Sequence, residues 1–530
     1  MRYLLDCLKG GMVLNSAGGA SWAIDDWQRL RRFLILGCEG GSYYAGERAL
    51  TAQNAVAVAR CLASDGPRAI EEIVAVSESG QAPSNDPAIF ALALGSAVPG
   101  ANKQAMRAIP RVCRTGSHLF SYVKAVRACR GMGRALRRGI ADWYRGQTPE
   151  GLVYQLLKYR QRGRLTHRDV LRLCHASPPT PAHEALFRYV VGAEAGPRLV
   201  GRDQNLREYG PVAAPLPELL EAFERLRQAR SAQQVVHELE ANPNLSWEMV
   251  PSKFLGERSV WETLLPNLPM TALLRNLGRL TANGTLDWRN QNIRLACERL
   301  TNPQALAGAR IHPLSVLVAL HTYRGGRSRG ELAWSPNPDI VKALDQAFYL
   351  SFGHLEPSRK RTVLALDVSG SMMSGIQRLS ALSCRDASAA MAMVTARTEP
   401  FFHVTAFCDK MVPLSINPRQ TLEQVVSATS RLSFAATDCA APMLWALQNK
   451  IEADTFVIYT DSETWSGRTS PCRALRQYRE KTGIPARLVV VGMVSNGFSI
   501  ADPDDQGMLD VVGFDTATPA TISLFSRGEI

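Results

Sequence analysis

The chain has 530 residues, of which 46% are hydrophobic and 21% charged, and its formal net charge is +13. A chain of this length is too long for one core, so we expect two or three domains of ordinary globular composition. The eleven cysteines include no CxxC pair, and no run of eighteen apolar residues occurs. This excludes a disulfide framework, a structural zinc site and a membrane span, and it predicts a cytoplasmic protein.

Residues 1–20 are expected to be a leader, because they are glycine-rich and too short and interrupted for a signal peptide. Residues 21–360 then show a helical pattern. Apolar residues recur three and four positions apart in blocks such as WQRLRRFLIL, PRAIEEIVAV and HEALFRYVV, with breakers such as SPPTP between blocks. Helix follows helix with hardly any strand pattern. We therefore predict an all-α stack of helical pairs, a degenerate HEAT-like solenoid.

The spacing of apolar residues changes at residue 361, and the new pattern continues through residues 361–530. Short apolar runs rich in Val, Ile and Phe (TVLALDVS, FFHVTAFC, TFVIYTDS and ARLVVVGM) alternate with helical segments. Alternating buried strands and helices are typical of a parallel sheet covered on both faces. This region is therefore predicted to be one doubly wound α/β domain.

The basic charge is concentrated in one stretch, residues 107–172. This stretch contains sixteen Arg and Lys residues against three carboxylates, an excess equal to the net charge of the whole chain. Such a concentration is typical of a surface that binds a polyanion. A charged helix face that is merely solvated remains the alternative for any one of these helices, but the excess lies in consecutive helices, which favours nucleic acid.

Local signals place these cations on helices. Arginines recur at near-helical spacing through RACRGMGRALRRGIADWYRG, and Thr148-Pro149 is a good start for the next helix. Thr166 and Asp169 have the spacing of a capping box. This box puts His167 and Arg168 in a first helical turn, where free backbone N–H groups attract phosphate. The candidate RNA-binding residues are Arg127, Arg130, Arg134, Arg137, Arg138, Lys158, Arg162, Arg164, His167, Arg168 and Arg172.

A candidate metal site follows the first strand of the α/β domain. That strand ends in Asp367, with Ser369 and Ser371 at alternate positions after it. Thr437 precedes a later helix and Asp461 ends another strand, so both are expected at the same edge of the sheet. A carboxylate with hydroxyls offers the oxygen ligands that Mg²⁺ prefers.

The pattern of DxSxS, a later TD and a further strand-ending Asp resembles the metal-ion-dependent adhesion site (MIDAS) of von Willebrand factor A domains. The resemblance implies Asp367, Ser369, Ser371 and Thr437 as direct or water-mediated ligands of a divalent ion, with Asp461 nearby and one position open for an acidic group. Two alternatives remain. The hydroxyls could simply cap the following helix, or the carboxylates could serve a metal-dependent hydrolase. A haloacid dehalogenase type of site is disfavoured, because Ser369 stands where that chemistry needs a second Asp.

Many separate motifs together resemble the Ro 60 kDa autoantigen family. They are CEGGSYYAGE (38–47), GMGRALRRGIADWY (131–144), THRDVLRLCH (166–175), LPMTALLRNLGRLT (268–281), IHPLSVLVAL (311–320) and ALDVSGSM (365–372), with ATDCAAPMLWA, YTDSETW and NGFSIADPDDQGMLD further on. The resemblance runs from about residue 15 to the end. It implies a closed ring of HEAT repeats, the TROVE domain, shut by a von Willebrand factor A domain. The leader is short, so N-terminal strand pairing of longer members is expected to be reduced.

The family resemblance also implies a function. Y RNA, a small noncoding RNA, would bind the outer surface of the ring, and single-stranded 3′ ends of misfolded RNAs would enter the central hole. In bacterial members Y RNA links the protein to an exoribonuclease, polynucleotide phosphorylase. The family's RNA contacts map onto Arg134, Arg137, Arg138, Lys158, Arg162, His167 and Arg168. We thus expect a non-catalytic, monomeric RNA-binding protein. The alternative is a helical scaffold for protein partners that uses the metal site to bind an acidic group.

Overall fold

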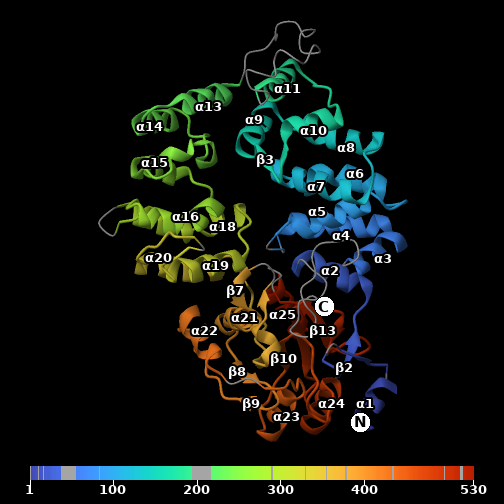
Figure 1. Cartoon of the computed structure of the whole chain (residues 1–530). Helices are drawn as coiled ribbons and strands as arrows, with labels where there is room; N and C mark the ends of the chain where they lie inside the picture. Colours follow the sequence, from blue (N-terminus) through green and yellow to red (C-terminus); the bar gives the residue numbers. More distant parts are fainter. Residues whose placement is uncertain are drawn as a thin grey trace.

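The computed structural model describes residues 2–36 except 10 and 16, 55–193 except 81 and 83, 217–287, 291–376 except 329 and 354, 379–432, 435–494, 496–513 and 517–530. Two arms of helices rise from an α/β domain (Figure 1). The first arm consists of α2 (Asp26–Leu36), α3 (Val56–Ser64), α4 (Gly66–Ser79), α5 (Asp86–Gly95), α6 (Asn102–Val112), α7 (Gly116–Cys129), α8 (Arg134–Arg145), α9 (Pro149–Lys158), α10 (His167–Cys174) and α11 (Pro181–Ala193).

The second arm consists of α13 (Glu218–Gln228), α14 (Ala232–Ala241), α15 (Arg258–Leu264), α16 (Met270–Ala282), α17 (Gln291–Leu300), α18 (Pro303–Gly308), α19 (Pro313–Arg324) and α20 (Pro338–Leu350), with short 3₁₀ turns η3 (Trp247–Met249), η4 (Ser252–Phe254) and η5 (Leu265–Asn267). Local chemistry sets many helix ends. The Asp65 side chain accepts a hydrogen bond from the first turn of α4, and Gly80 ends that helix with a φ of 77°. The left-handed conformation favours glycine there.

The helices of the first arm stack in two layers. In one layer α4 contacts α6, α6 contacts α8 and α8 contacts α10, while α5 contacts α7 in the other. In Figure 1, α6 and α8 lie on the side of the arm turned away from the second arm. This is the predicted stack of helical pairs. A short hairpin, β3 (Gln161–Arg162) with β4 (Leu165–Thr166), interrupts it between α9 and α10.

The two arms form a closed circuit with the α/β domain. At the far end α9 of the first arm contacts α13 of the second. At the near end α2 contacts strand β13 (Met508–Val512) and α19 contacts β7 (Leu379–Ser383) of the α/β domain. The backbone N–H of Leu422 also donates to Asp345 of α20 across 2.9 Å. Both ends of the helical series therefore rest on the same domain.

The α/β domain is built on a six-stranded sheet of order β13-β11-β10-β5-β8-β9. The strands are β5 (Thr362–Asp367), β8 (Phe402–Phe407), β9 (Met411–Val412), β10 (Thr455–Thr460), β11 (Arg487–Gly492) and β13, and its helices are α21 (Cys384–Thr398), α22 (Leu422–Ser430), α23 (Ala441–Gln448), α24 (Pro471–Thr482) and α25 (Thr518–Arg527). All strand pairs are parallel except β8 with β9. The strand order reverses between β5 and β10, so the fold is the predicted doubly wound sheet.

Both faces of this sheet are buried. Val363 of β5 and Ile458 of β10 pack in one cluster with α23 and α24. Leu364 and Tyr459, which alternate with them, belong to a cluster that includes α21 and continues into the helical arms. The alternation of side chains along a strand explains why nearly continuous apolar runs fit here.

The expectation of a leader at residues 1–20 is wrong. This segment forms α1 (Arg2–Lys9) and β1 (Val13–Leu14), and β1 pairs with β2 (Ala20–Ala23). In turn β2 pairs antiparallel with β12 (Phe498–Ser499) of the α/β domain. Strand pairing of the N-terminal segment, which was expected to be reduced, is thus present in β1 and β2. Backbone hydrogen bonds to a strand far along the chain give a short glycine-rich segment a fixed place.

Two further expectations concern the described residues. Their ten cysteines are all free thiols. None of their helices combines the length and hydropathy that crossing a bilayer requires.

Candidate functional site

The edge of the sheet where the strand order reverses carries the predicted oxygen ligands. Asp367 is the last residue of β5, and Asp461 directly follows β10. These two strands are hydrogen-bonded neighbours and run parallel, so their carboxyl ends meet. The turn after β5 places Ser371 in η6 (Gly370–Met373). The structure therefore brings together the residues that the sequence placed on separate strands.

Short hydrogen bonds hold these side chains in place. The backbone N–H of Ser369 donates to one Asp367 carboxylate oxygen across 2.8 Å, and the Thr460 hydroxyl donates to the other across 2.6 Å. The hydroxyl oxygens of Ser369 and Ser371 lie 3.0 Å apart. The Asp461 carboxylate accepts a hydrogen bond from the backbone N–H of Glu463 across 3.1 Å. All of these side chains are at most 2% exposed.

The electrostatics of this cluster favour a cation. Burial raises the pKa of Asp367 to about 7, with the Asp461 charge as the second cause, and burial also raises the pKa of Asp461. Thr437 Oγ1 and Asp461 Oδ2 are buried without a hydrogen-bond partner in the described chain. A divalent ion would neutralise both carboxylates and accept the unpartnered oxygens as ligands. The described residues contain no cluster of three or more His, Cys, Asp or Glu, so a metal here would depend on the hydroxyls.

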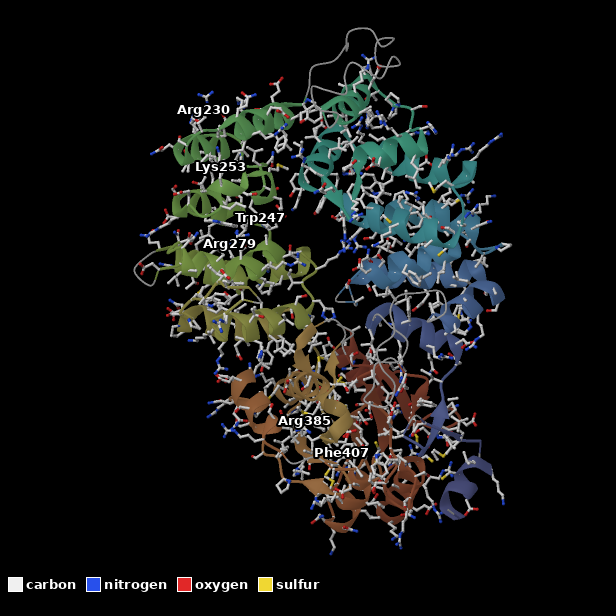
Figure 2. The ribbon with its side chains drawn as sticks, in the orientation of Figure 1. Arg230, Trp247, Lys253, Arg279, Arg385 and Phe407 are labelled. Carbon is white, nitrogen blue, oxygen red and sulfur yellow. The ribbon has the colours of Figure 1, made fainter. Side chains whose placement is uncertain are left out.

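Arg385 supports the first turn of the site, and sequence reasoning missed it. Its side chain is 1% exposed within α21 (Figure 2). The guanidinium donates to the backbone carbonyl of Val368, in the loop after β5, and to that of Leu432 across 3.3 Å. An arginine in CRDASAAMAM, a segment made mostly of small and apolar residues, was the available signal, because a buried guanidinium needs several acceptors.

The predicted basic stretch spans α6 to α10, and its exposed cations lie on α6, α7, α8 and α10 and along the β3–β4 hairpin. The side chains of Arg127, Arg134, Arg138, Arg164 and Arg172 are exposed, whereas those of Arg130, Arg137, Lys158 and Arg168 are half-buried. Neighbouring cations such as Arg145 and Arg162 are paired with carboxylates. No ion pair with a described carboxylate is found for Arg127, Arg134, Arg138 or Arg164. Arg134 and Arg138 are thus exposed, and uncompensated by the described carboxylates, on α8, a helix that lies on the side of the first arm turned away from the second (Figure 1).

His167 is misplaced in the sequence prediction. The capping box is present, with Thr166 Oγ1 accepting from the Asp169 N–H, and α10 begins at His167 as expected. The imidazole, however, is 1% exposed and lies against Phe120 and Trp143 instead of facing solvent. Burial lowers the pKa of His167 to about 3, so the ring is neutral. A buried neutral ring cannot contact phosphate.

Lys158 contacts the second arm, and Arg162 belongs to β3, a strand on the side of the first arm turned toward the second (Figure 1). Lys158 Nζ is 2.9 Å from the Tyr154 hydroxyl and 3.8 Å from the carboxylate of Glu248, in η3 of the second arm. Glu248 is the neighbour of Trp247, which Figure 2 labels. Arg162 approaches Asp86, at the start of α5, to 3.6 Å. The basic stretch thus has cations on the outer layer and cations near the second arm.

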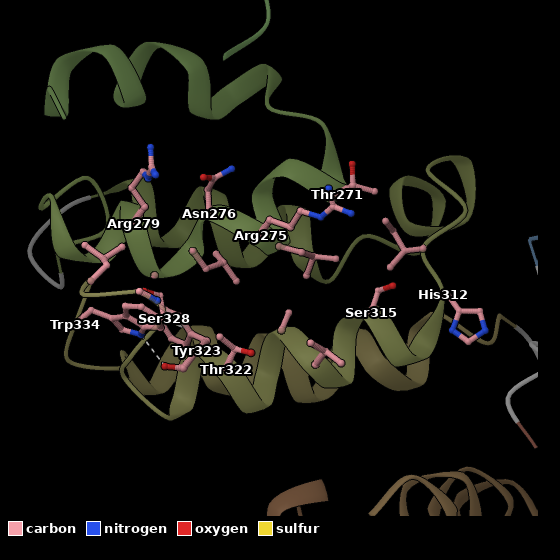
Figure 3. A pocket seen from close by; sticks show the side chains of 18 of the residues that line it. Thr271, Arg275, Asn276, Arg279, His312, Ser315, Thr322, Tyr323, Ser328 and Trp334 are labelled. Carbon is pink, nitrogen blue, oxygen red and sulfur yellow. Dashed lines mark hydrogen bonds between the residues drawn. The ribbon is translucent and has the colours of Figure 1, made fainter. Parts of the chain in front are cut away.

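A cavity of about 730 Å³ lies between α16 and α19. Figure 3 shows Arg275 of α16 and Ser315 of α19 among its lining side chains, with Trp334 near one end and its ring N–H donating to the Tyr323 carbonyl. Arg310 and, from the α4–α5 connection of the first arm, Ala82 also line it. The cavity therefore reaches the place where the two arms approach each other. Sequence reasoning did not single out these residues.

The motif CEGGSYYAGE at 38–47 lies outside the described residues. The motifs at 131–144, 166–175, 268–281 and 311–320 fall on or next to α8, α10, α16 and α19, and those of the C-terminal region surround the sheet edge.

The fold and the oxygen cluster define a two-part protein, a circuit of helices joined to an α/β domain of the von Willebrand factor A type. Residues 13–323 match the family model described as TROVE domain, and residues 361–526 match that described as Ro60 vWA domain. The chain belongs to the Ro60 family.

Known proteins resemble this chain over nearly its whole length. It is 38% identical to RNA-binding protein RO60 of Deinococcus radiodurans, over 98% of this chain and 96% of that protein. It is 33% identical to RNA-binding protein RO60 of Caenorhabditis elegans, over 99% of this chain and 92% of that protein. The crystal structure of the D. radiodurans RO (RSR) protein is similar with a TM-score of 0.70 and 36% identity, covering 96% of this chain and 100% of that one.

Proposed function

We propose that this protein is a non-catalytic RNA-binding component of a ribonucleoprotein. It binds a small noncoding RNA of the Y RNA type on its outer surface and single-stranded 3′ ends of misfolded or structured RNAs in the space that its two arms enclose. An exoribonuclease such as polynucleotide phosphorylase, tethered through the RNA, then matures or degrades the bound RNA. The protein acts as a cytoplasmic monomer in this noncoding RNA quality control. Two relatives named RNA-binding protein RO60 support the RNA-binding part.

The observation that carries the proposal is the set of exposed arginines without a carboxylate partner in the described parts of the chain, two of which lie on α8 in the outer layer. Arg134 and Arg138 are one helical turn apart on α8, both exposed, with Arg127 and Arg164 on elements nearby. Each guanidinium group can donate two parallel hydrogen bonds to the oxygens of one phosphate. Duplex RNA is recognised mainly through its shape and phosphates, so such a surface needs little base specificity.

The cations near the second arm suit a single strand. Lys158 contacts Glu248 of that arm, Arg162 belongs to β3 on the side turned toward it (Figure 1), and Arg275 and Arg310 line the cavity between α16 and α19. Arginine can hold an unpaired strand both by charge and by stacking on bases. A strand that enters between the arms would meet cations from both.

The cluster at the end of β5 would hold Mg²⁺ or a similar ion, with Asp367, Ser369, Ser371 and Thr437 as the ligand set and Asp461 beside it. The unpartnered Thr437 Oγ1 and Asp461 Oδ2 support this assignment. A bound ion would supply positive charge and one open coordination position for an acidic group. The chain's own residues orient the oxygens and exclude water, since all are buried.

Binding of a structured small RNA to a triple variant tests the RNA surface. Arg134→Ala, Arg138→Ala and Arg164→Ala together should weaken binding and lower the salt slope by about two to three, because each contact releases about one counterion. The matched control removes Arg227, Arg258 and Arg294, each paired with a carboxylate on its own helix. Undiminished affinity in the first variant would reject the surface. It would favour a scaffold that binds protein partners through the metal site.

A second test addresses catalysis. Purified protein incubated with RNA and Mg²⁺ should leave the RNA at its original length. Shortening that Asp367→Asn abolishes would instead identify a metal-dependent hydrolase.

A further inference from the structure

The loop that carries Asp461 is held by the N-terminal segment. The Ser21 hydroxyl, on β2, donates to the Ser462 carbonyl across 3.0 Å. The side-chain amide of Asn15 donates to the Thr464 carbonyl across 2.8 Å and to the Ser21 hydroxyl across 3.0 Å. All of these atoms belong to buried residues. The residues next to Asp461 thus take their hydrogen bonds from a segment about 440 residues earlier in the chain.

The fit between the two segments is close. A Cβ added to Gly19 would lie 1.8 Å from the Thr464 carbonyl oxygen. Only glycine permits this approach of two backbones. The N-terminal segment is therefore a shaped support for the 462–464 loop.

A second support reaches the same loop from the first arm. Arg32 of α2 is 2% exposed and donates to both carboxylate oxygens of Asp510, across 2.7 and 2.6 Å. Its other terminal nitrogen donates to the side-chain oxygen of Asn496 across 3.2 Å. Asn496 in turn donates through its side-chain amide to the Asp461 carbonyl across 2.6 Å. Asn496 thus connects Arg32 of α2 to the backbone of Asp461.

We infer that the N-terminal segment and α2 position Asp461, so that binding of a divalent cation and docking of the N-terminal segment on the α/β domain reinforce each other. This inference rests on the proposed metal site. Groups that orient ligands raise metal affinity even though they never touch the ion. Because linkage is reciprocal, the ion must also stabilise the docked N-terminal segment.

Titration calorimetry of the full-length chain with Mg²⁺ tests the positioning role. The Asn15→Ala, Ser21→Ala double variant removes both hydrogen bonds to the loop carbonyls without altering a ligand. We expect its Mg²⁺ affinity to fall about tenfold. The matched control is Asn276→Ala, which removes a buried amide bonded to Ala272 of α16, outside the α/β domain. Its affinity should be unchanged, and thermal melts check that both variants fold.

Hydrogen exchange with and without Mg²⁺ supplies an independent readout. In the wild-type chain Mg²⁺ should slow exchange of the β2 amides as well as those of the 461–465 loop. This protection of β2 should be lost in the double variant, whereas a purely structural role would leave no dependence on Mg²⁺. Unchanged affinity in the double variant, or Mg²⁺ protection of the loop alone, overturns the coupling and leaves the metal site standing. No Mg²⁺ binding by the wild-type chain overturns the metal site and the coupling together.

Discussion

The Tyr144 hydroxyl and Nδ1 of His167 lie 2.9 Å apart inside the first arm, between α8 and α10. The imidazole also lies against Phe120, with 4.7 Å between ring centroids, and a Cβ on Gly116 would be 2.7 Å from Nε2. His167 therefore joins three helices, although it stands at the start of a basic helix where a phosphate contact was expected.

Replacing His167 should destabilise the protein. His167→Ala leaves a cavity and removes the hydrogen bond between the imidazole and the Tyr144 hydroxyl, so we expect a loss of about 2–4 kcal/mol in the free energy of unfolding. Chemical denaturation measures this change. Arg168→Ala, at the next position with a half-buried side chain, is the comparison and should cost less. RNA affinity lost without any loss of stability would return His167 to the binding surface.

Acid should destabilise the first arm through two histidines. Burial lowers the pKa of His118 to about 4 and that of His167 to about 3, against 6.5 for an exposed ring. Between these values the unfolded chain binds more protons, so stability is fully present above about pH 6.5 and falls as the pH drops toward 3. Each ring contributes up to a few kcal/mol at the acid end. Denaturation at several pH values measures this dependence. In this window the free energy of unfolding should change less with pH for the double variant His118→Gln, His167→Gln than for wild type.

Cations on the two sides of the first arm should differ in the RNA that they bind. Arg134→Ala should weaken binding of a folded small RNA and lower its salt slope by about one. Arg162→Ala should instead weaken binding of a single-stranded oligonucleotide, because Arg162 belongs to β3, on the side of the first arm turned toward the second (Figure 1). Filter binding with both RNAs gives the comparison. Equal losses for both RNAs in each variant would show that the two surfaces are not separate.

The effect of Thr437→Val on the free energy of unfolding should change sign when Mg²⁺ is added. Without Mg²⁺ the buried hydroxyl has no hydrogen-bond partner among the described residues, so replacing it by a methyl group should be neutral or slightly stabilising. With Mg²⁺ at about a hundred times its Kd, the wild-type chain should gain about 2.7 kcal/mol, and the variant less. Thermal melts in EDTA and in Mg²⁺ measure both terms. An identical Mg²⁺ effect in the two chains would remove Thr437 from the ligand set.

Local sequence patterns were sufficient to predict the structure of a segment wherever its own residues determine that structure. The capping box of Thr166 with Asp169 begins α10 where the spacing places it. On α8, the side chains of Ile140, Trp143 and Tyr144 are buried, as their helical spacing indicates. The apolar run that ends at Asp367 is a strand buried on both faces. These features depend on neighbours within one or two turns, so they are legible in the sequence.

Other features depend on contacts between distant segments, and only the tertiary structure decided them. His167 is buried because α7 and α8 cover the first turn of α10. The spacing of apolar residues around His167 does not predict this burial. Strand β2 forms where Ala23 pairs with Phe498 of β12, and Arg32 is buried because Asp510 and Asn496 lie opposite it. The sequence by itself determined the helices, the strands and the concentration of basic charge. The partners of each buried polar group came from packing, because an unpaired hydrogen-bonding group in the core costs more than any local preference supplies.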